Sequence, residues 1–122
     1  PEISKNLIIG ASGVLKKNGI NNIAKIYAPG VFEIPVIIAK NIKKFDAFIA
    51  LGCVIKGETP HFDFISNSSI HGLMNLSTSF LKPIGNGILT CLNKNQAIIR
   101  SDPNKKNKGG EASKAILSVL KL

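Results

Sequence analysis

A nearly continuous apolar run over residues 45–55 is followed by a short polar turn and then by a helical pattern, and this order restricts the chain to few folds. The run has the length of a strand, and its hydrophobicity is typical of a strand that is buried on both faces of a parallel sheet. The turn, residues 56–61, reads Lys-Gly-Glu-Thr-Pro-His. Because α/β proteins bind ligands beyond the carboxyl ends of their strands, the sequence predicts a small-molecule site at this turn.

The residue types in the turn indicate which chemistry this site performs. Gly57 allows the backbone to approach a ligand closely, and Thr59 offers a hydroxyl group. The free N–H groups at the start of the following helix favour an anion. His61 is the only group in the turn that exchanges protons near neutral pH. We therefore expect a phosphate site with a proton-transfer residue beside it.

The rest of the chain alternates between helical and strand-like patterns. Helices are predicted over residues 3–15, with a stop near Gly19, and over 33–44, 62–80, 96–100 and 112–120; strands are predicted over 23–28, 45–55 and 84–91. Strands that alternate with helices indicate an α/β protein with a parallel sheet covered on both faces, here as one domain over residues 1–122. Three strands are few and the pattern starts with a helix, so we expect a further strand upstream.

The composition narrows the class of ligand. The net charge of +9 is compatible with nucleic acid, but the lysines are mostly scattered and do not alternate with aromatic residues, which favours phosphorylated metabolites. No apolar run reaches the roughly 18 residues that span a membrane. The mean hydropathy of +0.19 suggests subunit interfaces. Cys53 and Cys91 lie in or beside apolar runs without metal-ligand spacing, so we expect reduced core cysteines, no metal and a cytoplasmic location.

Three motifs carry a resemblance to a known family. They are Pro-Gly-Val-Phe-Glu-Ile-Pro at 29–35, Leu-Gly-Cys-Val-Ile-Lys-Gly-Glu-Thr-Pro-His-Phe-Asp at 51–63, and Asn-Lys-Gly at 107–109. With them the chain resembles 6,7-dimethyl-8-ribityllumazine synthase over nearly its whole length. The resemblance implies a flavodoxin-like three-layer α/β/α sandwich assembled into pentamers, with sixty-subunit capsids in some members. It also implies the penultimate step of riboflavin biosynthesis, a cofactor-free condensation of 5-amino-6-ribitylaminouracil with 3,4-dihydroxy-2-butanone 4-phosphate.

The same resemblance implies the site residues. The catalytic residues would be His61, Arg100 and Lys108, and the substrate-binding residues would be Val31, Phe32, Glu33, Cys53, Val54, Ile55, Glu58, Thr59 and Asn86. In the family, the positions of Asn86, Arg100 and Lys108 reach the site from a neighbouring subunit. Asn86 stands where many members carry a Phe against the heterocycle, and the family's upstream strand carries an aromatic residue that lies outside this sequence.

Each of these roles has a structural alternative. Glu33 would favour the helix dipole from a first turn without binding substrate. Lys105, Lys106 and Lys108 would ordinarily form a solvated loop, and His71 has the pattern of a surface or interface residue. Cys53 is a poor candidate nucleophile, because an apolar strand raises the pKa of a thiol. At the level of the whole protein, the alternatives are a catalytically weakened lumazine-binding or shell-forming protein and a basic nucleic-acid binder.

Overall fold

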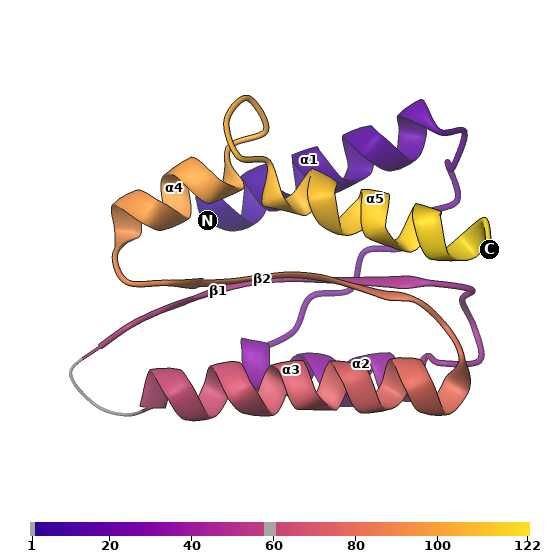
Figure 1. Cartoon of the computed structure of the whole chain (residues 1–122), viewed down its shortest axis with the longest axis horizontal. Coiled ribbons are helices and arrows are strands. Elements are labelled where there is room, and N and C mark those ends of the chain that lie inside the picture. Colours follow the sequence, from indigo (N-terminus) through magenta and orange to yellow (C-terminus); the bar gives the residue numbers. More distant parts are fainter. Residues whose placement is uncertain (1, 58–60) are drawn as a thin grey trace.

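The computed structural model describes residues 2–57 and 61–122, which form helices on both faces of a small sheet (Figure 1). The elements in chain order are α1 (Glu2–Lys17), the 3-10 turn η1 (Val31–Glu33), α2 (Ile34–Lys40), β1 (Phe48–Ile55), α3 (His61–Phe80), β2 (Ile84–Cys91), α4 (Lys94–Ser101) and α5 (Lys108–Leu120). The flavodoxin-like three-layer α/β/α arrangement with a parallel sheet is thereby confirmed.

The two described strands run parallel and in register. Phe48 pairs with Ile84 at one end of the ladder, and Ile55 pairs with Cys91 at the other. Both carboxyl ends therefore lie at the same end of the sheet, on the left in Figure 1, where α3 and α4 begin. This is the end at which the sequence predicts the site.

Hydrophobic side chains fill the space on each side of the sheet. Helices α2 and α3 cover one face and α1, α4 and α5 cover the other (Figure 1). The core beneath α2 and α3 consists of Ile38, Ile42, Ala50, Leu73 and Ile88. On the opposite face the buried residues are Leu7, Leu89, Cys91 and Ala97, with a second group of Leu15, Ile116 and Leu117. The sheet thus has a helical layer packed against both faces, as alternating strands and helices require.

The strand predicted over residues 23–28 is not formed, so that prediction is wrong. The segment crosses from the layer of α1 to the layer of α2 without pairing to β1 or β2 (Figure 1). A strand needs a neighbour to receive its N–H and C=O groups, and in the described residues none runs beside this segment. The local apolar pattern does not show whether such a neighbouring strand is present.

Other boundaries differ in smaller ways. Helix α2 ends at Lys40 rather than at residue 44, because the Asn41 side chain donates to the carbonyl of Ile37 and the chain turns. Strand β1 begins at Phe48 rather than at 45, and only Ala50 within it is fully buried, since β1 has one described neighbour and an open second edge. The predicted stop of α1 is confirmed, with Gly19 left-handed at φ 80°.

Candidate active site

A cavity of about 580 Å³ opens where β1 ends and α3 begins. It is lined by Gly30, Val31, Phe32, Glu33, Cys53, Val54, His61 and Ile65. Six of these are residues that the sequence predicts for the site. They come from three separate elements, η1, β1 and α3, so the fold brings together two motifs that lie about twenty residues apart along the chain.

The turn η1 forms one wall because a glycine in β1 leaves room for it. A Cβ atom at Gly52 would lie 2.9 Å from Cγ2 of Val31, closer than side chains pack. Likewise, a Cβ at Gly30 would lie 2.9 Å from Oε1 of Glu33, so the carboxylate of Glu33 lies against the backbone at Gly30. Gly52 thus allows Val31 to approach the strand, and Gly30 leaves room for the Glu33 carboxylate beside the cavity.

His61 is the first residue of α3, and its exposed side chain lies on the cavity. Ile65, one turn further along the same helix, faces the same cavity. Gly30 and Ile65 are the lining residues that the sequence analysis did not assign. The i, i+4 spacing from His61 to Ile65 was the signal that could have identified the second of them.

Cys53 lies on the cavity as a neutral thiol. Burial, together with the neighbouring Cys91, raises its pKa to about 11. Both cysteines are free thiols, and Cys91 is fully buried. The direction of the shift agrees with the expectation that an apolar strand suppresses thiolate formation, so Cys53 contributes an uncharged surface rather than a nucleophile at neutral pH.

Arg100 is placed at the carboxyl end of β2 and does not line this cavity. Its Nη1 donates to the carbonyl oxygen of Thr90 at 3.2 Å, and the same atom lies 3.7 Å from Sγ of Cys91. The side chain is half-buried on α4. This contact ties one end of the guanidinium group to the strand and leaves further N–H donors for a ligand.

The other predicted residues lie apart from the cavity of their own chain. Ile55 is the exposed last residue of β1. Asn86 is exposed near the start of β2, paired with Ala50, and its side chain accepts from the N–H of Ile88. Lys108 is the first residue of α5 rather than a loop residue. Glu58 and Thr59 lie outside the described residues.

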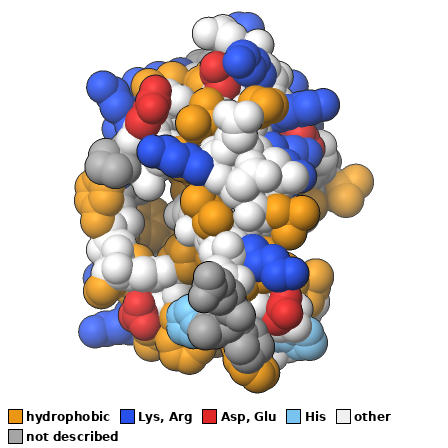
Figure 2. Space-filling model, turned by 90° about the vertical axis from the view of Figure 1, so that its left-hand side faces the viewer, with side chains coloured by type: hydrophobic (Ala, Val, Ile, Leu, Met, Phe, Trp, Pro, Cys, Tyr) orange, Lys and Arg blue, Asp and Glu red, His pale blue; other side chains and the backbone are white. Residues whose placement is uncertain are grey.

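Charge on the carboxyl end of the sheet is mainly positive. Figure 2 looks onto this end, and lysine and arginine side chains are spread over it, most of them in the upper half. Such a field attracts anionic ligands.

Within the described residues, no three or more His, Cys, Asp or Glu side chains form a group that could hold a metal ion. Of the described helices, none is long and apolar enough to cross a membrane.

Comparison with known proteins identifies the family. The family model described as 6,7-dimethyl-8-ribityllumazine synthase matches residues 1–122. A protein of that name from Buchnera aphidicola subsp. Acyrthosiphon pisum (strain Tuc7) is 45% identical over 123 residues, which cover 97% of this chain and 77% of the relative. Those from Novosphingobium aromaticivorans and Zymomonas mobilis subsp. mobilis are 43% and 45% identical over 118 residues, which cover 95% of this chain and 84% of each relative. The chain belongs to the 6,7-dimethyl-8-ribityllumazine synthase family.

Proposed function

We propose that this protein is a transferase of riboflavin biosynthesis that joins 5-amino-6-ribitylaminouracil to 3,4-dihydroxy-2-butanone 4-phosphate, giving 6,7-dimethyl-8-ribityllumazine. The proposed reaction rests on the family membership. The proposed position of the active site rests on the cavity, which brings the Val31–Glu33 turn, the end of β1 and His61 together. The reaction comprises imine formation, loss of phosphate, ring closure and loss of water, and the unit that performs it is the single domain 1–122.

The proposed roles follow from the chemistry of each wall of the cavity. Val31, Phe32 and Glu33 bind the ribityl chain and ring of the uracil substrate, with the Glu33 carboxylate accepting from hydroxyl groups. Cys53 and Val54 line the pyrimidine from the cavity wall, and Ile55, the exposed last residue of β1, is proposed to border it although it lies outside the cavity lining. The uncharged thiol of Cys53 suits this apolar contact, because its raised pKa of about 11 keeps it protonated.

Proton transfer and phosphate binding are assigned to the polar groups. His61 moves protons during imine formation and dehydration, a role that contributes typically 10²–10⁴-fold to a rate. The turn with Glu58 and Thr59 is proposed to hold the phosphate, together with the fork of Arg100. Holding the two substrates together supplies much of the remaining acceleration.

A neighbouring subunit is proposed to complete the site. Asn86, Arg100 and Lys108 do not line the cavity of their own chain, so we propose that they reach the cavity of the next subunit in a pentamer. Exposed apolar side chains on α3 support an interface: Phe64 is 67% and Met74 61% exposed. Larger icosahedral capsids are proposed because the unextended loop before Lys108 resembles that of capsid-forming members of the family. A cytoplasmic location fits the two free thiols.

The test is formation of the fluorescent lumazine from the two purified substrates. The wild-type protein should form it, and His61→Ala should slow turnover about a hundredfold while the protein still assembles. His71→Ala is the matched control, because His71 is exposed on the same helix and lies off the cavity. Absence of product from folded wild-type protein would reject the enzyme, and equal steady-state constants for His61→Ala and wild type would reject the site.

A further inference from the structure

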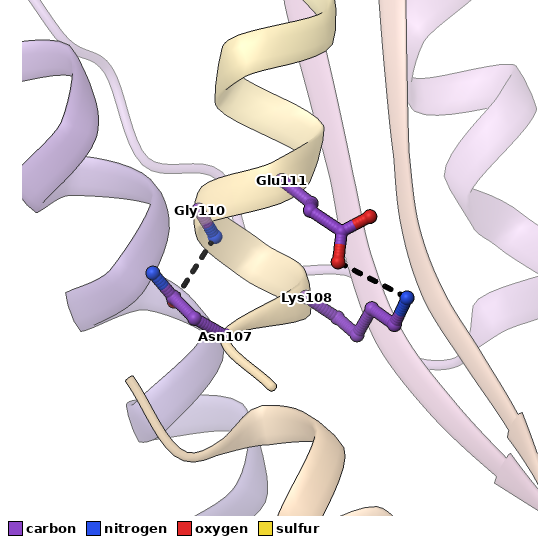
Figure 3. Close-up of polar contacts among 4 residues, drawn as sticks. All are labelled: Asn107, Lys108, Gly110 and Glu111. Atoms are coloured by element: carbon purple, nitrogen blue, oxygen red, sulfur yellow. Dashed lines mark hydrogen bonds and ion pairs between the residues drawn. The ribbon is translucent and has the colours of Figure 1, made fainter. Parts of the chain in front are cut away.

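The first turn of α5 is held in one conformation by its capping residue. Asn107 has a left-handed backbone (φ 45°, ψ 55°), and its Oδ1 accepts a hydrogen bond from the N–H of Gly110 at 3.2 Å (Figure 3). The carbonyl of Asn107 accepts from the N–H of Glu111 at 3.0 Å. The left-handed region is accessible to Asn at little cost, and the side-chain cap pairs a donor that the helix leaves open.

Helix α1 packs directly against the first turn of α5. A Cβ atom at Gly10 would collide with Oδ1 of Asn107, and one at Gly109 would collide with the backbone carbonyl of Leu7. A Cβ at Gly110 would collide with the side-chain amide of Asn107. Three glycines therefore allow two helix backbones to meet around the Asn107 side chain, and the residues on both sides of Lys108 lie against α1.

The side chain of Lys108 forms an ion pair with Glu111. Nζ of Lys108 lies 3.0 Å from Oε2 of Glu111 at i, i+3 spacing. In Figure 3 both side chains project from the side of α5 away from α1. The two side chains are 41% and 60% exposed, so the pair adds little to stability. In this structure the pair sets the orientation of Lys108, a long, flexible side chain of a type that loses considerable entropy on binding.

We infer that Glu111 is a positioning residue that orients the Lys108 ammonium group for its part in the site of the neighbouring subunit. The inference rests on the function proposed above, in which Lys108 acts at the site. An ammonium group has three donors, and the ion pair with Glu111 occupies one of them, which leaves two for oxygen atoms of a substrate. Glu111 therefore holds Lys108 without having to release it when the substrate arrives.

The experiment compares Glu111→Gln with wild type and with Glu2→Gln as matched control, since Glu2 is also an exposed acid in the first turn of a helix. For Glu111→Gln we expect kcat/KM to fall about three- to fivefold, the size of an exposed ion pair. The thermal midpoint should not change, because both side chains of the pair are exposed. Glu2→Gln should match wild type in every constant. The difference between wild type and Glu111→Gln should shrink in high salt.

A double-mutant cycle separates positioning from an independent effect. In the Lys108→Met background, Glu111→Gln should cause no further loss. A further three- to fivefold loss there would overturn the inference, because Glu111 would then act without Lys108. Wild-type constants for Glu111→Gln, with Lys108→Met impaired, would overturn the inference and leave the proposed function intact. Wild-type constants for Lys108→Met would overturn both the Lys108 assignment and the inference.

Discussion

Two buried serines in opposite helical layers have different hydrogen-bonding environments and therefore predict opposite mutational effects. Ser69 of α3 is 1% exposed, and among the described residues its hydroxyl has no hydrogen-bond partner. Ser113 of α5 is fully buried, and its hydroxyl donates to the carbonyl oxygen of Ala11 in α1 at 2.8 Å. Both side chains have the same size and both lie within helices, so substitution by alanine compares an unpaired hydroxyl with a paired one.

The expected magnitudes follow from these environments. A buried hydroxyl without a partner costs about 1–3 kcal/mol, and alanine has a better helix propensity than serine by about 0.5 kcal/mol. Ser69→Ala also leaves a small void, so we expect a net stabilisation of about 1 kcal/mol, or about 4 °C in Tm for a chain of this size. Ser113→Ala loses a hydrogen bond worth about 1 kcal/mol and should lower the free energy of unfolding by about 0.5–1 kcal/mol.

The measurement is urea and thermal unfolding of the two variants and wild type at one protein concentration, because assembly makes Tm depend on concentration. The reasoning predicts that the two midpoints move in opposite directions. A fall in the midpoint of Ser69→Ala as large as that of Ser113→Ala would show that the Ser69 hydroxyl is paired, and would refute the account of this interior.

Two further predictions concern the site. Arg100→Ala should abolish useful binding of the phosphorylated substrate, because the guanidinium group anchored on Thr90 supplies the proposed phosphate fork; Arg100→Lys should restore only part of it, and an unchanged KM in both variants would contradict the assignment. Alkylation of Cys53 by iodoacetamide should be slow at pH 8 and rise about tenfold per pH unit toward its pKa of about 11, since at pH 8 the thiolate is roughly two hundredfold scarcer than in a free cysteine peptide. Mass spectrometry locates the modified residue, and a midpoint near the ordinary thiol pKa would contradict the burial.

Much of the fold was predictable because helix and strand patterns are local. The strand over 84–91 was found with its observed bounds, and α3 was found to within one residue, since Pro83 and the polar turn mark their limits. The pKa direction of Cys53 also followed from its apolar neighbours. The failed strand over 23–28 shows where this reasoning ends, because a strand depends on a pairing partner that lies elsewhere in the chain.

The sequence alone determined the α/β class, the motif from β1 into α3 and the family, because each is written in contiguous residues. Only the tertiary structure decided which motifs share a cavity: Gly52 admits Val31 to the end of β1, twenty-one residues further along the chain, and no local pattern encodes that contact. Arg100 and Lys108 lie off the cavity of their own chain, an arrangement that the family resemblance had already implied. Local periodicity reports which face of an element is apolar, whereas the packing of two elements depends on the space that each leaves for the other.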